Sequence, residues 1–161
     1  MVYKIKKGNH YSCFIPSISF NDTFNFQIKF LSDPSYISKS DKNQEDVNKI
    51  FGVSDSFHHH ISSVRIGWFY DTKLKANQLV VYSYSNRIVR VDNLGLFNKN
   101  EVLDITLIIV KNHYLVHRKD TGSFQLIPRE SNWNGPRYIL HPYFGGNEVA
   151  DKDYLIEIKR L

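Results

Sequence analysis

A period-two alternation of side chains near the C-terminus is the feature that most constrains the fold of this chain. Tyr154, Ile156 and Ile158 fall on one face of an extended segment, and Glu157 and Lys159 fall on the other. Such alternation predicts a half-buried β-strand. An apolar strand left open at a sheet edge invites aggregation, so this last strand must be paired on at least one side. We expect the N-terminal strand to be among its partners.

The same alternation recurs along the chain in short runs that turn signals separate. Phe24, Phe26 and Ile28 share one face of an extended segment, for example, and polar residues lie between them. The predicted strands cover residues 2–7, 23–31, 63–70, 78–85, 88–91, 102–110, 114–118, 124–127, 138–140 and 154–159. Helical periodicity is almost absent, and residues 47–53 are expected to form at most one helical turn. Short strands at this spacing predict an all-β fold, an antiparallel β-sandwich or jelly roll, with a closed barrel as the second choice.

Length and composition fit a single domain that spans residues 1–161. A chain of 161 residues buries about two-thirds of the surface that its unfolded form exposes, which is enough for one core. The one cysteine, Cys13, cannot form an internal disulfide and is expected to be a small buried hydrophobe. We find neither a signal peptide nor an apolar segment of the roughly 20 residues that span a bilayer. We therefore expect a soluble protein with no membrane partner.

The length, the strand density and the closing unit GGN…DYLIEIKRL resemble the concanavalin A-like lectin and glucanase sandwiches. Two fragments, HHHISSVRIGW and HPYFGGNEVADKDYLIEI, are also similar to short uncharacterised proteins of gut bacteria and their phages. In those proteins an Ala-Pro-His-Asp run follows Gly-Gly-Asn, whereas this chain has Ala-Asp-Lys-Asp at residues 150–153. The resemblance implies a concanavalin-like sandwich with a lectin or virion role, and it transfers no catalytic residues.

Aromatic and amide side chains are concentrated on the predicted loops toward the C-terminus. Trp133 lies between Asn132 and Asn134, and Tyr143 and Asn147 follow in the next loop. A sugar presents apolar C–H faces and a ring of hydroxyl groups, so its site needs a flat apolar surface beside fixed polar partners. These five residues are the predicted glycan-binding residues. The alternative is that Trp133 caps one end of the sandwich and that Tyr143 belongs to the core.

A second group of residues has the types that a polysaccharide lyase needs. Arg65, Tyr82, Tyr84 and His59 would lie on neighbouring strands of one concave sheet. Abstraction of the proton beside a uronate carboxylate needs a base, Tyr or His, and a cation that neutralises the acid. Ordinary surface decoration explains these residues equally well. Hydrolysis of a glycosidic bond needs two carboxylates about 5 to 10 Å apart, and we find no such pair on the predicted strands.

Three consecutive histidines raise the question of a metal site. On an extended backbone His58 and His60 share a face at a spacing that suits one metal ion, while His59 points away. Two imidazoles are not a site, because zinc sites use three or four protein ligands. A third ligand would have to come from a carboxylate or from another histidine, with His10, His113, His117 and His141 as candidates. We therefore predict no metal and no cofactor.

The formal net charge of +5 suits an anionic partner, such as nucleic acid, an acidic glycan or an acidic protein surface. The basic residues are nevertheless scattered in small groups, as in Lys6 with Lys7 and Arg118 with Lys119. Such scattering is usual for solvated strand faces. Because no nucleic-acid-binding motif is recognised, nucleic acid ranks below a glycan as the expected partner.

Together these features predict a non-catalytic, carbohydrate-binding β-sandwich module. One alternative is a phage or virion structural protein that packs against neighbouring subunits, with a homo-oligomer expected, and a second is a polysaccharide lyase-like enzyme. A lectin would leave Trp133 and Tyr143 in an open groove, whereas a building block would bury them at an interface above ~1,000 Å². A lyase would bring His59, Arg65 and a tyrosine within hydrogen-bond reach of one another.

Overall fold

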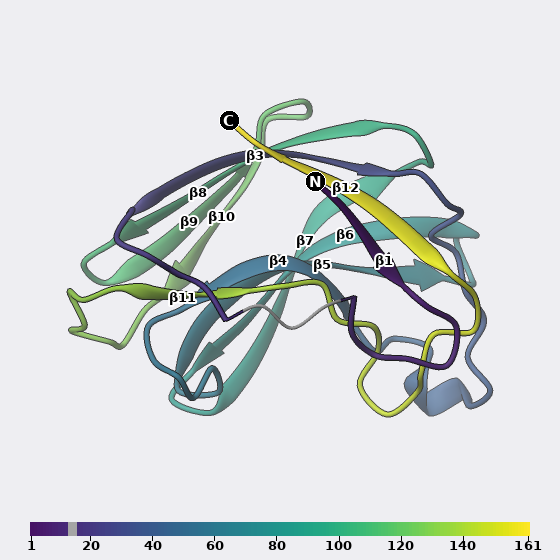
Figure 1. Ribbon diagram of the computed structural model, residues 1–161, viewed down its shortest axis with the longest axis horizontal. Coiled ribbons are helices and arrows are strands. Elements are labelled where there is room, and N and C mark those ends of the chain that lie inside the picture. The colour runs from purple at the N-terminus through teal and green to yellow at the C-terminus, as the bar shows by residue number, and fades with distance from the viewer. Residues whose placement is uncertain (13–15) are drawn as a thin grey trace.

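Antiparallel β-strands make up almost all the regular structure of the residues that the computed structural model describes, 1–12 and 16–161. The strands form two six-stranded sheets that face each other (Figure 1). Sheet A has the strand order β1 (Val2–Ile5), β12 (Tyr154–Arg160), β3 (Thr23–Phe30), β8 (Val102–Val110), β9 (His113–Arg118) and β10 (Ser123–Pro128). Sheet B has the strand order β2 (Ile18–Ser19), β11 (Arg137–Leu140), β4 (Asn48–Ser54), β5 (Ser62–Asp71), β6 (Ala76–Ser85) and β7 (Ile88–Phe97). A short 3-10 helix, η1 (Asp41–Asn43), lies in the polar loop before β4.

This arrangement confirms the predicted antiparallel β-sandwich. Within the described part of the chain, no helix is long and apolar enough to cross a membrane. Cys13 lies outside the described residues, so its predicted burial stays a prediction.

The two ends of the chain lie side by side in sheet A, as the alternation near the C-terminus predicts (Figure 1). Strand β12 is paired with β1 on one side and with β3 on the other, and Ile156 lies opposite both Tyr3 and Phe30. Tyr154 and Ile156 are fully buried, which confirms the predicted inward face. Strand β11, although close in sequence, belongs to the opposite sheet, so the closing stretch bridges the two layers.

Aromatic side chains fill much of the space between the sheets. The Phe30 and Trp68 rings lie 5.0 Å apart between centroids, and the Phe144 and Tyr154 rings lie 4.9 Å apart. The buried Trp68 indole donates a hydrogen bond to the Pro34 carbonyl oxygen at 3.1 Å, which satisfies its one polar atom. Both sheets therefore contribute to one core.

Residues 47–53 lie largely within strand β4, which corrects the helical turn that their sequence predicts. The reason is a register shift in the ladder to β5 between Lys49 and Phe51. A β-bulge of this kind places an extra residue in one strand and interrupts the two-residue period. Ile50 and Phe51 consequently both contribute to the core although they are neighbours in the chain, and no clean alternation marks the strand in the sequence.

Strand β7 is longer than predicted, because it runs past Val91 to Phe97. The ladder to β6 shifts register where Leu79 faces Gly95 and Val80 faces Asn93. Gly95 has a φ of +98°, a conformation that a residue without a Cβ adopts readily. The bulge lets the strand continue through a segment whose composition resembles a loop.

The outer face of sheet B carries a row of residues that the strand register aligns. Gly52 on β4 faces Arg65 on β5, and Arg65 faces Tyr82 on β6. A Cβ at position 52 would overlap the Val64 carbonyl oxygen and the Arg65 side chain. Gly52 therefore leaves the space that the Arg65 stem occupies as it rises from the sheet.

Candidate functional site

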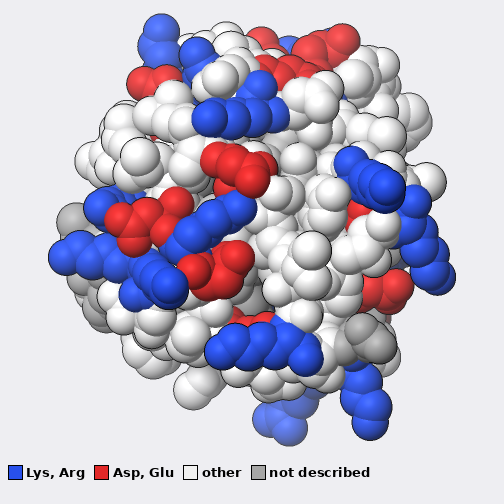
Figure 2. All heavy atoms as spheres, turned by 90° about the vertical axis from the view of Figure 1, so that its right-hand side faces the viewer, with Lys and Arg blue, Asp and Glu red and all other residues white. Residues whose placement is uncertain are grey.

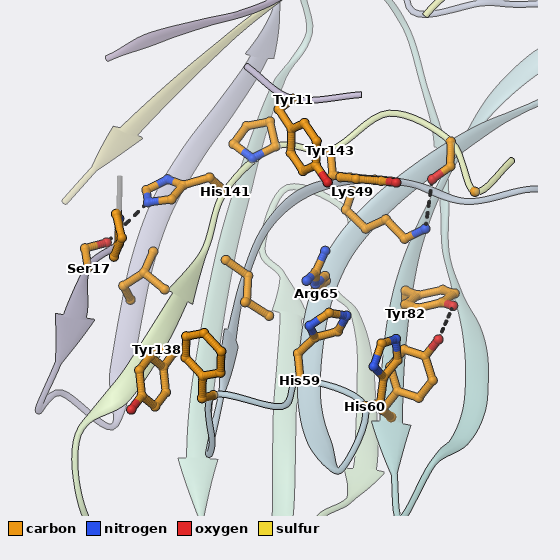
Figure 3. Close-up of a pocket in the computed structure, with 18 residues that line it drawn as sticks. Tyr11, Ser17, Lys49, His59, His60, Arg65, Tyr82, Tyr138, His141 and Tyr143 are labelled. Atoms are coloured by element: carbon orange, nitrogen blue, oxygen red, sulfur yellow. Dashed lines mark hydrogen bonds between the residues drawn. The ribbon is translucent and has the colours of Figure 1, made fainter. Parts of the chain in front are cut away.

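A cleft of about 600 Å³ lies on the outer face of sheet B. Arg65, Tyr82 and Tyr84 contribute from β5 and β6, and Lys49 contributes from β4 (Figure 3). The loop between β4 and β5 supplies His59 and His60, and the segment from β11 onward supplies residues 138–143 together with two glycines. Tyr11, Pro16 and Ser17 add a contribution from near the N-terminus, so four sequence-distant stretches meet in one hollow.

Arg65 is a half-buried cation that has no anionic partner in the described part of the chain. Among the described residues, neither a hydrogen bond nor an ion pair engages its guanidinium group. Burial lowers the pKa of Arg65 to about 10, so the group is charged at neutral pH. The fully buried arginines differ in this respect, since each has a carboxylate within 3.3 Å: Arg118, Arg129 and Arg137.

Lys49 adds a second cation to the cleft. Its Nζ donates a hydrogen bond to the Gly145 carbonyl oxygen at 3.3 Å and lies over the Tyr82 ring, 4.6 Å from the centroid. Burial, and then the charge of Arg65, lowers the pKa of Lys49 to about 8. No Asp or Glu belongs to the described lining of the cleft, so the lining does not supply the carboxylate pair of a glycoside hydrolase.

His59 and the tyrosines complete the group that the lyase hypothesis singles out. Burial, followed by the charge of Arg65, lowers the pKa of His59 to about 4, so its imidazole is neutral at pH 7. Tyr82 Oη donates a hydrogen bond to Tyr84 Oη at 3.2 Å, and burial raises the pKa of Tyr82 above its usual 10. The structure brings Arg65, His59, Tyr82 and Tyr84 together in one cleft, although among the described residues no side-chain hydrogen bond joins Arg65 or His59 to the others.

The low pKa of His59 predicts a pH dependence of stability. The usual histidine pKa is 6.5 and the folded value is about 4, so between these values the unfolded chain binds a proton that the native chain does not. The contribution of the neutral His59 side chain to the free energy of unfolding is therefore complete above pH 6.5 and is lost as the pH falls toward 4. We expect His59→Gln to flatten the decline of the free energy of unfolding over this window, as measured by urea unfolding at a series of pH values.

The matched control for this experiment is His58→Gln, which changes an exposed neighbour on the same loop. In this control the free energy of unfolding should decline with falling pH as steeply as in the wild type. A His59→Gln profile parallel to the wild-type profile would show that this ring is not held neutral in the native state.

The histidine triplet adopts a different arrangement from the one predicted for an extended chain. The His59 and His60 rings lie 4.0 Å apart between centroids and are tilted by 38°, and His60 also packs edge-on against Tyr84 at 4.7 Å. Within the described residues, no group of three or more metal-ligating side chains is close enough to hold an ion.

The five predicted glycan-binding residues are not all in one place. Tyr143 lines the cleft, where its ring stacks on His10 at 5.1 Å between centroids. Trp133 lies in the loop between β10 and β11, 46% exposed, and its indole donates to the Pro136 carbonyl oxygen at 2.9 Å. The exposed residues Asn132, Asn134 and Asn147 are, like Trp133, absent from the described lining of the cleft. A glycan-binding role for these four residues stays a prediction.

Several residues that line the cleft are not among the predicted glycan-binding or lyase residues, and His141 is predicted only as a candidate metal ligand. Lys49 lies in β4, where the bulge interrupts the two-residue alternation by which a strand is recognised in the sequence. His141 approaches Ser17, with Nε2 and Oγ 3.2 Å apart (Figure 3), and Tyr138 lines the same cleft from β11. Their sequence signal is only that polar and aromatic residues flank the apolar run of β11.

Charged side chains elsewhere on the surface are mixed in sign. On the face that Figure 2 shows, Lys and Arg side chains are interleaved with Asp and Glu side chains. That face therefore carries no large field of one sign, in agreement with the scattered basic residues of the sequence. The cleft differs, because its described lining holds cations and no carboxylate.

Searches of known protein families and of curated protein sequences found no match for this chain. Solved structures do share its fold. Alginate lyase AlyC3 has a TM-score of 0.64 at 10% sequence identity, over 99% of this chain and 74% of that one. The marine PL7 alginate lyase AlyA1 from Zobellia galactanivorans has a TM-score of 0.54 at 8% identity, over 100% of this chain and 65% of that one.

Ancestral congerin Con-anc is similar over 98% of both chains, with a TM-score of 0.50 and 12% identity. At such identities the likeness establishes the fold alone. The chain is thus a concanavalin-like, jelly-roll β-sandwich, as its closing unit and strand density predict.

Proposed function

We propose that the cleft on sheet B binds an acidic glycan, with a uronate carboxylate paired to Arg65. The observation that carries this proposal is the half-buried guanidinium, which has no anionic partner among the described residues and no carboxylate in the lining around it. Removing a charge from water costs free energy unless an opposite charge compensates it. The planar fork of arginine matches a carboxylate in a bidentate fashion, so a uronate is the ligand group that fits.

The remaining walls suit the rest of a sugar. The aromatic side chains of Tyr82, Tyr84, Tyr138 and Tyr143 line the cleft. Such rings pack against the C–H faces of pyranoses while their hydroxyl groups take part in hydrogen bonds. The volume of about 600 Å³ lies within the usual range of small-molecule sites, roughly 300–1,000 Å³.

A second candidate function is cleavage of that glycan by β-elimination, and the neutral His59 beside Arg65 favours it. In this reaction Arg65 neutralises the uronate carboxylate, and His59 removes the proton from the adjacent carbon. The electron pair of that C–H bond forms a carbon–carbon double bond as the neighbouring C–O bond breaks. The departing oxygen takes a proton from Tyr82 or Tyr84, whose hydroxyl groups are linked by a hydrogen bond.

A panel of glycans distinguishes these functions. Oligouronates, with alginate oligosaccharides first because two similar folds are alginate lyases, are compared with neutral oligosaccharides of equal length by calorimetry. The ultraviolet absorbance of the unsaturated product is followed in the same samples. Binding of oligouronates alone supports a lectin role, and a rise in absorbance supports a lyase.

Two variants locate the binding surface, and one outcome rejects the proposal. Tyr82→Ala should weaken binding and Trp133→Ala should leave it unchanged if the ligand occupies the cleft; the reverse result would move the site to the Trp133 loop. Absence of acidic-glycan binding together with a discrete, stable oligomer would favour the structural, virion-type role instead.

A further inference from the structure

The outer edge of sheet B is a strand segment whose apolar side chains are exposed. Strand β7 is the last strand of that sheet, so one side of its backbone has no strand partner among the described residues. Ile88 is 72% exposed, and Val89 and Val91 are each 46% exposed. β-branched residues on an open strand edge favour pairing with another strand.

The backbone of this segment has hydrogen-bonding groups directed outward. The turn between β6 and β7 has two residues with positive φ, Asn86 at 48° and Arg87 at 68°, as in a type I′ hairpin. The residues that flank such a turn form a hydrogen-bonded pair, and these pairs alternate along an antiparallel ladder. Ile88 is the flanking residue of β7, so Val89 and Val91 direct their N–H and C=O groups away from β6.

We propose that β7 pairs with β7 of a second copy of this chain, in an antiparallel ladder centred on Val91. In this register Arg90 of each copy lies opposite Asp92 of the other, and a two-fold axis passes between the two Val91 residues. Within one copy Arg90 Nε lies 2.7 Å from Asp92 Oδ2, so these side chains already share a face. Pairing then creates a network of two arginines and two aspartates.

The charges select this register. A ladder centred on Arg90 instead would place two arginines directly opposite each other, which is destabilising. Beyond Asn93 the strand is no longer open, because Gln125 of β10 donates a hydrogen bond to the Asn93 carbonyl oxygen at 2.8 Å. The pairing is therefore confined to residues 89–93, and its self-complementary part is the segment from Arg90 to Asp92, centred on Val91.

The dimer would place two clefts on one side of a continuous sheet. A two-fold axis perpendicular to a sheet keeps the same face of both copies upward, and Tyr82 of the cleft lies directly opposite Val91 in the ladder. A polymer long enough to reach both clefts would be held more tightly than a short one, through effective concentration alone. The pairing itself does not depend on what the cleft binds.

Charge reversal at the edge tests the proposal by sedimentation over a concentration series. Wild-type protein should show a reversible monomer–dimer equilibrium. Arg90→Asp and Asp92→Arg should each raise the dimer dissociation constant about tenfold or more, because each places like charges opposite each other twice. An equimolar mixture of the two variants should form a heterodimer, since every facing pair is then again Arg with Asp.

Two further variants keep the result interpretable. Lys111→Asp changes an exposed charge at the turn between β8 and β9 and should dimerise as the wild type does. Val91→Pro removes an N–H group that β6 does not use, so it should leave the fold intact and abolish the dimer. A monomeric wild-type protein, a mixture that stays monomeric, or a Val91→Pro variant that still dimerises would overturn the proposal.

Discussion

Arg65→Ala is expected to weaken the binding of an oligouronate by at least about 30-fold, because truncating one side of a desolvated charge pair costs 2 kcal/mol or more. The affinity of Arg65→Lys for the oligouronate should lie between those of Arg65→Ala and the wild type, since lysine keeps the charge but loses the bidentate fork. Isothermal titration calorimetry of the three proteins with one oligouronate measures the effect.

The stability of the same variants separates a binding role from a structural one. In the ligand-free protein Arg65 has no hydrogen-bond or ion-pair partner among the described residues, so its removal should leave the free energy of unfolding unchanged or increase it. Lys99→Ala, which removes an exposed cation in the turn between β7 and β8, is the matched control and should change neither the affinity nor the free energy of unfolding. Loss of stability in Arg65→Ala, with affinity retained, would contradict the assignment of this residue to a ligand.

Asp55→Ala is expected to destabilise the fold by about 3–5 kcal/mol, the usual cost of breaking a buried ion pair from one side. Asp55 is 2% exposed and accepts hydrogen bonds from Tyr114 Oη at 2.7 Å and from Arg129 Nε at 2.8 Å. Its Oδ1 also lies 3.3 Å from Arg137 Nε. Removal of the carboxylate leaves Arg129 buried without a counter-charge. Denaturant unfolding measures the loss.

The position of Asp55 links this network to the cleft. Its backbone N–H donates to Ser62 O at 3.1 Å across the base of the β4–β5 loop, and that loop carries His59. Asp55→Asn should lower the free energy of unfolding by less than Asp55→Ala does, because asparagine keeps the shape of the side chain and some of its hydrogen bonds. The control is Lys152→Ala, which breaks the exposed Lys152–Asp33 pair and should cost no more than about 1 kcal/mol. Equal stability of Asp55→Ala and this control would mean that the buried network contributes nothing measurable.

Much of the fold could be predicted from local patterns, because an antiparallel sandwich buries one face of each strand. The alternation at Tyr154 and Ile156 marked the inward face of β12, and the spacing of Arg65 from Val64 placed the arginine on the outer face of β5. The alternation of apolar and polar residues could not reveal where the backbone of a strand is irregular. The bulge after Lys49 removed the alternation of β4, and the bulge at Gly95 concealed the second half of β7.

The candidate site was predictable only where regular strands form it. Tyr82 and Tyr84 follow from the two-residue period of β6, and their place beside Arg65 follows from the pairing of neighbouring strands. Contacts between loops depend on the closure of the whole sandwich, which no local pattern encodes. Tyr143 and Trp133 therefore looked like parts of one site in the sequence, although only Tyr143 reaches the cleft.

The most direct test of the central claim is a nuclear magnetic resonance titration of ¹⁵N-labelled protein with an oligouronate. Binding in the cleft predicts that the Arg65 Nε–H signal and the amide signals of Lys49 and Tyr82 shift as the ligand is added, while those of residues 132–134 stay in place. Shifts confined to residues 132–134, or no shift at ligand concentrations far above those of the protein, would contradict it.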